Sequence, residues 1–350
     1  MRFANVRMSK AKVVSIVLLC VLVCCRPSWS QVTITNLQID VKNAVGYLTD
    51  TPDNTKLATD PNVTQRVPTL NFGSSVLLGD IVAVKGKPAK GLLGDRIVTI
   101  NASQNAMPGQ AIADVERSSI VELVWEIQQA DGTPVGSIVA LGFSGGSVSG
   151  LPPGAPPTAR QSDFAIIGGT GAFLGARGQA VFFQSDLPGT GGIVASRPAS
   201  ATEDPVNRRA HGGRSTSYLL QLIPLFVPEV AATAGGPAVV HASDSSLVTA
   251  AKPAKSGEVL TLYATGLGPT RPALEPGKVF TANPLQVANS PIEVTVGGQA
   301  AEVLYAGGYP GTADGFQVNF RLPSGMVPGV ASLQVTAAFI QGREVSISIQ

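Results

Sequence analysis

One stretch of the sequence matches the turn that carries the nucleophilic serine of many hydrolases. "GFSGG" spans Gly142 to Gly146 with Ser144 at its centre, and Asp163 and His211 follow in the order that such a triad uses. That serine must stand on a turn leading into a helix, but "SVSGLPPGAPP" follows here. Gly- and Ser-rich loops produce this match by chance, so we do not expect a hydrolase.

A second stretch, "IIGGTGAFLGARG" (166–178), is similar to a nucleotide-binding loop. Such a loop holds a pyrophosphate only where a helix begins directly after it. Here "ARGQAVFFQ" follows, which has the composition of a strand. We therefore interpret the glycines as a structural turn between two strands, with left-handed backbone angles. These glycines are Gly168, Gly169, Gly171, Gly175 and Gly178.

Arg177 is the basic residue whose position most favours a chemical role, because it begins a strand beside this turn in a largely apolar half of the chain. One interpretation is an ion pair at a rim with an acid such as Asp163. The other makes Arg177 the candidate catalytic or ligand-binding residue, a fixed charge that holds an anion or stabilises developing negative charge. Trp125, Phe143 and Tyr218 are candidates to line such a pocket with Arg177, and each also fits an ordinary core.

We expect no metal and no cofactor. His211 and His241 are the two histidines and lie far apart in the sequence, whereas a zinc site needs three or four converging ligands. All three cysteines lie within the first 25 residues.

The first 30 residues have the three parts of a secretory signal: basic residues, the apolar run "VVSIVLLCVLVCC", and small residues at Ser28 and Ser30. We expect cleavage near Ser30, and hence a secreted, periplasmic or cell-surface protein. The segment holds five of the 25 basic residues and none of the 23 acidic ones, so the remaining chain has a net charge of −3. With no run of Lys or Arg, this balance argues against nucleic-acid binding.

The composition and pattern of the remaining chain are typical of an all-β protein with two domains, 31–226 and 227–350. Charged residues make up 14% of the sequence, whereas globular proteins average about 25%. The first domain contains eight strand-like runs without helical periodicity between them, which predicts a closed, eight-stranded antiparallel barrel. The runs are 32–42, 75–87, 95–103, 112–128, 135–145, 163–169, 177–185 and 215–225. The polar segments 43–74 and 186–214 are expected to be long loops.

Two features of these runs bear on the walls of the barrel. Along 120–128, apolar residues at odd positions alternate with Glu122, Glu126 and Gln128, which predicts one apolar and one polar face. Runs five to eight carry apolar residues on both faces, so their outer wall should be covered by the second domain or by another subunit.

The second domain alternates more regularly. Ile292, Val294 and Val296 share one face, and Gly297–Gly298 predicts a two-residue hairpin turn. Short strands separated by Gly/Pro turns over this length predict an immunoglobulin-like sandwich.

Residues 32–225 resemble the dirigent and allene oxide cyclase superfamily, on "DFAIIGGTGAFLGARGQAVF" (163–182), "GTPVGSIVALGF" (132–143) and "GDIVAV" (79–84). The resemblance implies an eight-stranded barrel with an apolar cavity, commonly trimeric, that acts without cofactor or metal. Arg177 is the only polar site residue that the resemblance implies for this chain. The C-terminal half is similar to an uncharacterised domain of secreted bacterial proteins of the Solibacter type, on "GEVLTLYATGLGPTRPA" (257–273), "PIEVTVGGQAAEVLYAGGYPG" (291–311) and "GFQVNFRLPSG" (315–325).

The leading functional hypothesis is an exported protein whose barrel binds a small, mostly apolar ligand, with the C-terminal domain as an adhesive or spacer. One alternative is a cofactor-free cyclase, isomerase or dirigent-like enzyme that acts in the barrel. The other is a purely structural surface protein.

Overall fold

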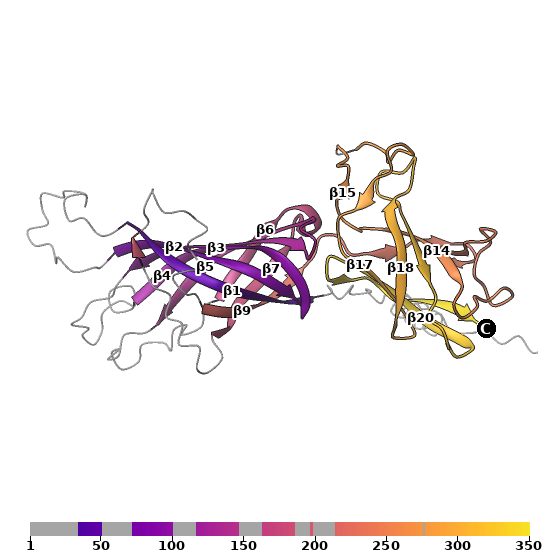
Figure 1. The fold of residues 1–350 in the computed structure, drawn as a ribbon, viewed down its shortest axis with the longest axis horizontal. Coiled ribbons are helices and arrows are strands. Elements are labelled where there is room, and N and C mark those ends of the chain that lie inside the picture. Colours follow the sequence, from indigo (N-terminus) through magenta and orange to yellow (C-terminus); the bar gives the residue numbers. More distant parts are fainter. Residues whose placement is uncertain are drawn as a thin grey trace, which may run out of the picture. The chain divides into compact units, whose positions relative to one another are not determined.

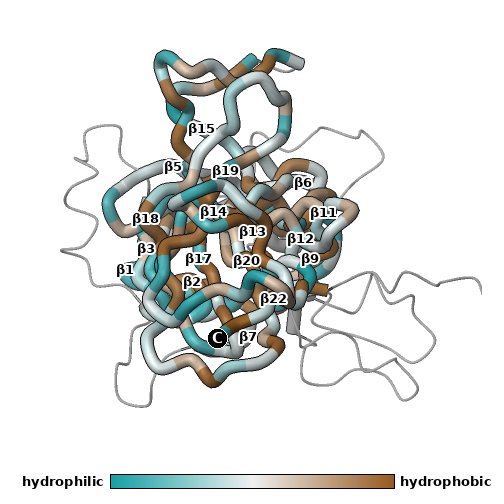
Figure 2. The backbone as a smooth tube through the Cα atoms, turned by 90° about the vertical axis from the view of Figure 1, so that its right-hand side faces the viewer, coloured by the Kyte–Doolittle hydropathy of each residue, from teal (hydrophilic) through white to brown (hydrophobic). Residues whose placement is uncertain are grey.

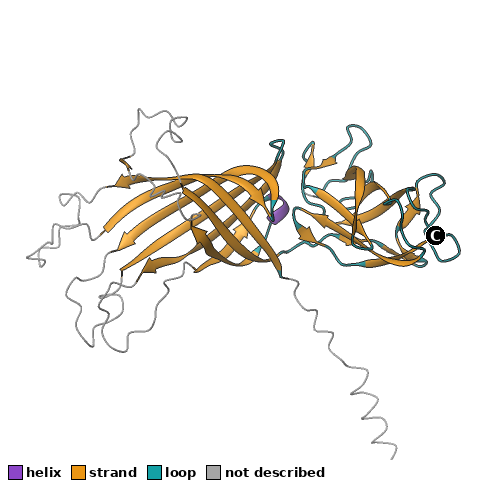
Figure 3. Cartoon of the chain, turned by 60° about the horizontal axis from the view of Figure 1, so that its bottom comes forward, coloured by secondary structure: helices purple, strands orange, loops and turns teal. Residues whose placement is uncertain are grey.

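A computed structural model describes residues 34–50, 72–100, 117–146, 163–185, 197–198, 214–275 and 277–350. The expected signal segment 1–30 and His211 lie outside this part of the chain. Within it nearly every element is a strand, and the exception is the short 3-10 helix η1 (Gly171–Phe173) (Figure 3). Among the same residues, no helix has the length and apolar character needed to cross a membrane.

The N-terminal strands form a closed antiparallel barrel, which confirms the predicted architecture (Figure 1). Neighbouring strands pair in the order of the chain, and closure follows because β1 pairs with both β2 and β9. The two residues of β8 (Arg197–Pro198) add to β1 in parallel. The eight barrel strands are β1 (Thr35–Asp50), β2 (Phe72–Val84), β3 (Lys87–Ile100), β4 (Arg117–Gln129), β5 (Pro134–Gly146), β6 (Asp163–Gly169), β7 (Arg177–Ser185) and β9 (Arg214–Ile223).

The inside of the barrel holds one apolar cluster to which every barrel strand contributes. On β4, the residues at positions 121, 123, 125 and 127 are buried while Glu122 and Glu126 are exposed, as the alternation predicts. Leu37 of β1, Leu93 of β3 and Leu220 of β9 are fully buried in the same cluster. The described interior is thus a packed core of aliphatic and aromatic side chains.

The sequence predicts a loop between the second and third strand-like runs, 75–87 and 95–103, and this prediction is wrong. The chain turns at Lys85 and Gly86, both with positive φ, and β3 begins at once at Lys87. Gly91 resembles a loop residue in the sequence but lies within β3, where a Cβ atom would stand 1.9 Å from the carbonyl oxygen of Glu126. The glycine allows two strands to approach closely rather than ending one of them. Likewise, the expected loop 43–74 is strand as far as Asp50 and again from Phe72.

The outer wall of the barrel carries exposed apolar side chains over β4 and β5. Ile120, Val124, Leu141 and Phe143 are each at least 40% exposed, and Ile120 lies opposite Phe143 in the strand register. We call these four residues the outer apolar patch. The ion pair between Arg96 and Glu122 lies on the same face, with 3.0 Å between Nη1 and Oε2.

The C-terminal strands form a second, curled sheet around a separate apolar cluster (Figure 1). Along the tube, hydrophobic and hydrophilic residues alternate, as expected for strands with one buried face (Figure 2). The strands are β10 (Glu229–Val230), β13 (Val239–His241), β14 (Val259–Thr265), β15 (Thr270–Arg271), β16 (Val287–Ala288), β17 (Ile292–Val296), β18 (Gln299–Gly308), β19 (Phe316–Arg321), β20 (Gly329–Ala337), β21 (Ile340–Gln341) and β22 (Val345–Ile349), beside the small pair β11 (Ala232–Thr233) and β12 (Gly236–Pro237).

Strand β18 makes this sheet continuous. Its first residues pair with β17 across the turn at Gly297–Gly298, which confirms the predicted hairpin, and its remaining residues pair with β19. The described strand order is therefore one curled path, and the two separate layers of an immunoglobulin-like sandwich stay a prediction.

Candidate functional site

The four residues expected to line a pocket in the barrel do not come together. Trp125 on β4 and Tyr218 on β9 are buried inside the barrel and meet edge to face, with ring centroids 5.3 Å apart. The Trp125 indole nitrogen is buried and has no hydrogen-bond partner among the described residues. Both rings belong to the packed cluster described above, which fits the interpretation of ordinary core.

Phe143 and Arg177 lie on the outside, which corrects the expectation that they face the interior. On β5, Ala140 is fully buried and the side chain of Phe143 points outward, 61% exposed. Arg177 is exposed, and its Nη1 donates hydrogen bonds to the carbonyl oxygens of Ile167 (2.5 Å) and Ala176 (3.0 Å). The guanidinium thus fastens the ends of β6 and β7 together from outside the barrel.

Three of the five glycines in the glycine-rich turn have the left-handed backbone angles that the sequence predicts. Gly171, Gly175 and Gly178 have positive φ, whereas Gly168 and Gly169 belong to β6. The turn contains η1, and a Cβ atom on Gly171 would lie 2.5 Å from the carbonyl oxygen of Val135. Side chains would therefore prevent this turn from closing against β5.

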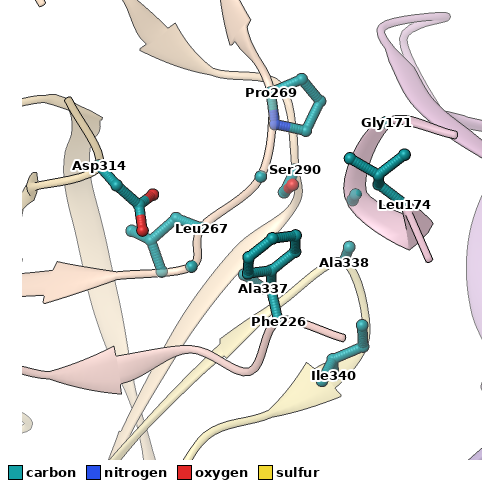
Figure 4. A pocket seen from close by; sticks show the side chains of 13 residues that line it. Gly171, Leu174, Phe226, Leu267, Pro269, Ser290, Asp314, Ala337, Ala338 and Ile340 are labelled. Carbon is teal, nitrogen blue, oxygen red and sulfur yellow. The ribbon is translucent and has the colours of Figure 1, made fainter. Parts of the chain in front are cut away.

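The turn instead contributes to a cavity of about 420 Å³, which we call the Phe226 pocket (Figure 4). Its wall combines six segments of the chain: the η1 turn, the segment after β9, the loop after β14, the residues before β17 and β19, and the turn from β20 to β21. The lining residues are Gly171, Ala172, Leu174, Phe226, Gly266, Leu267, Gly268, Pro269, Ser290, Asp314, Ala337, Ala338 and Ile340. This volume lies within the range that small-molecule sites occupy.

The loop after β14 determines one side of the pocket. Gly266 and Gly268 both have positive φ, and a Cβ atom on Gly268 would stand 3.2 Å from the Ala172 Cβ. The sequence "GLG" therefore lets the loop pass close to η1 while Leu267 is fully buried in the C-terminal core.

Another side of the pocket depends on a strained turn. Ala338 and Phe339 have φ of 49° and 67°, which is unusual for residues with a Cβ and especially for a bulky one. Phe339 is 5% exposed and packs in the same apolar cluster as the barrel residues. Burial of the ring stabilises a turn that its backbone angles disfavour, and the turn holds Ala338 and Ile340 in the pocket wall.

Two polar residues, Ser290 and Asp314, belong to the lining of this pocket. Ser290 is 3% exposed, and its hydroxyl oxygen has no hydrogen-bond partner among the described residues. Asp314 is exposed at the surface, and partial desolvation raises the pKa of its carboxyl group above the usual value, an effect that the nearby backbone N–H of Gly266 partly offsets. Figure 4 shows Ser290 between Pro269 and Phe226, and the Asp314 carboxylate beside Leu267.

His241 has a structural environment rather than a ligand-binding one. It is almost fully buried, with Nδ1 2.6 Å from Oε1 of Glu258 and Nε2 3.2 Å from the carbonyl oxygen of Lys252. In the described parts of the chain, no group of three or more His, Cys, Asp or Glu residues is placed to hold a metal ion.

Sequence reasoning missed the Phe226 pocket because its wall comes from six distant segments. The glycines of "GLG" are a signal for an unusual backbone, but they do not reveal that the loop meets η1. No family model matches the chain, and no curated protein matches it.

Proposed function

We propose that this protein is an exported binding protein that takes up a small, mostly apolar ligand in the Phe226 pocket. This keeps the ligand class expected from the sequence and moves the site from the barrel interior to the pocket. The observation that carries the proposal is a cavity of about 420 Å³ whose wall is mainly apolar and yet includes Ser290, whose buried hydroxyl has no hydrogen-bond partner among the described residues. Binding sites typically combine an apolar wall with a few polar groups that orient the ligand.

Phe226 supports the proposal by its exposure. Its ring lines the pocket and is 52% exposed, although it stands in a wall of apolar residues. A ligand that covers the ring would remove apolar area from water, which is favourable at roughly 25 cal/mol per Å².

The neutral fluorescent probe N-phenyl-1-naphthylamine tests this directly, because its emission rises on entering an apolar site. We expect the wild-type protein to bind it, and Phe226→Ala to weaken binding roughly fivefold, from the loss of about 1 kcal/mol of apolar contact. Phe143→Ala is the matched control, because it removes an exposed phenylalanine of the outer apolar patch and should leave the affinity unchanged. A wild-type protein that does not bind the probe, or equal effects of the two variants, would refute the proposal.

No observation in the described residues favours the alternative of a cofactor-free cyclase or dirigent-like enzyme, because Arg177 lies outside the barrel. The resemblance to those families and to the Solibacter-type domain stays an expectation. The structural alternative predicts that the probe does not bind, so the same titration separates it from the proposal.

A further inference from the structure

A second cavity adjoins the Phe226 pocket. It measures about 220 Å³ and shares Gly268, Pro269 and Asp314 with the larger pocket. Leu274, Phe280 and Phe316 contribute its apolar lining. Asp314 therefore stands where the two cavities meet.

Asp314 carries the one ionisable side chain in the lining of the larger pocket. The second cavity adds Glu275 and Lys278, and neither forms an ion pair with Asp314 among the described residues. The nearby backbone N–H of Gly266 favours the charged form of this carboxylate. Asp314 is thus an exposed carboxylate in the lining of both cavities, and no cation among the described residues forms an ion pair with it.

Ser290 is an independent sign that a polar group of a ligand belongs here. Its hydroxyl can donate one hydrogen bond and accept two, it is 3% exposed, and it forms none with the described residues. A buried polar group left in this state is destabilising, which is a common property of sites whose partner is a ligand.

From this combination we infer that the ligand is an amphipathic amine, with an apolar body in the Phe226 pocket and a protonated nitrogen at Asp314. The inference rests on the proposed function and specifies the ligand class. An ammonium group would form a charge-assisted hydrogen bond to the carboxylate. A carboxylate ligand would be repelled by Asp314, and a neutral ligand would leave its charge uncompensated.

Three probes with the same apolar chain separate these cases: n-octylamine, 1-octanol and octanoate, each displacing N-phenyl-1-naphthylamine at pH 7. We expect octylamine to compete roughly tenfold or more better than octanol, and octanoate to compete least. Asp314→Asn should remove the advantage of octylamine and leave the affinity for octanol unchanged. Glu302→Gln is the matched control, because it also removes one carboxylate but acts on the exposed pair with Arg321.

The outcomes distinguish the two proposals. If the wild-type protein binds neither the fluorescent probe nor octanol, the proposed function fails. If octanol competes as well as octylamine, or if Asp314→Asn keeps the preference for the amine, the pocket binds apolar ligands but the amine inference is overturned. A preference for octylamine that disappears as the pH falls and Asp314 becomes protonated would support the assignment to this carboxylate.

Discussion

A Cβ atom on Gly268 would lie 2.5 Å from the hydroxyl oxygen of Ser290. Gly268 has φ of +90°, so a side chain here meets both backbone strain and a close contact inside the pocket wall. We predict that Gly268→Ala lowers the free energy of unfolding by about 1–2 kcal/mol and also weakens binding of N-phenyl-1-naphthylamine. Denaturant titration and probe fluorescence measure the two effects.

Gly325→Ala separates strain from pocket geometry. Gly325 has φ of +74°, but nothing lies within 4 Å of the Cβ that it would gain. This variant should lose a similar amount of stability and keep wild-type affinity. If Gly268→Ala binds the probe as tightly as Gly325→Ala does, the loop does not shape the ligand site.

The turn at Ala338 and Phe339 offers a second test, because the two residues should respond in opposite directions. Ala338→Gly removes the cost of a positive φ and should raise the free energy of unfolding by up to about 1 kcal/mol. Phe339→Gly relieves the same strain but loses a buried ring, and should lower it by about 2–3 kcal/mol. The midpoints of urea unfolding, followed by Trp125 fluorescence, measure both. A stabilising Phe339→Gly would show that ring burial does not hold this turn.

Much of the fold follows from the sequence, because strand alternation depends on local composition. The alternation of apolar and polar residues is enough to predict the inward face of β4. The glycine pair is enough to predict the hairpin at Gly297–Gly298. The boundary between β2 and β3 does not follow in the same way. Glycine marks either a turn or a close approach of two strands, and Gly91 belongs to the second class, which only the partner strand reveals.

The candidate site was harder to predict than the fold. Sequence patterns identify residues of unusual type, such as Arg177, but not the direction in which an isolated side chain points. The Phe226 pocket depends on contacts between residues as distant as Ala172 and Gly268, and no local period encodes them. Ser290 carries no sequence signal either, because its unpartnered hydroxyl is a property of the packed structure.

The outer apolar patch provides a test of assembly. We propose that a second copy of the chain covers Leu141 and Phe143, which are exposed in the single chain. The ion pair of Arg96 with Glu122 on the same face supplies both signs of charge for a self-complementary contact. Light scattering after size exclusion should give an oligomer for the wild type and a smaller species for the double variant Leu141→Ser, Phe143→Ser.

Val327→Ser is the control for this experiment, because Val327 is also exposed but lies outside the patch. It should leave the molar mass unchanged. A monomeric wild-type protein would contradict the assembly and leave the outer apolar patch as solvent-exposed surface.

The contact between His241 and Glu258 predicts unequal effects of two carboxylate deletions. Oε1 of Glu258 lies 2.6 Å from Nδ1 of His241, and Oε2 accepts the backbone N–H of Lys255 at 2.8 Å. Glu258→Ala leaves Nδ1 of the buried His241 and this N–H without their acceptor, so we expect a loss of about 1–3 kcal/mol in unfolding free energy. Glu302→Ala breaks an exposed pair with Arg321 and should cost less than about 1 kcal/mol. Equal losses would show that burial of His241 adds nothing to the contact.

The Asp314 carboxylate should also affect the stability of the protein when no ligand is bound. Desolvation raises the pKa of its carboxyl group in the folded protein, so the charged form is less favourable there than in the unfolded chain. The folded state is therefore destabilised by this group above the raised pKa, and the penalty disappears as the pH falls below the unfolded value of 3.8. Asp314→Asn should accordingly make the ligand-free protein slightly more stable than the wild type at pH 7, and the difference should vanish in acid. Thermal unfolding of both proteins across this pH range measures the effect, and a variant less stable than the wild type at pH 7 would mean that the carboxylate contributes to the fold rather than awaiting a cation.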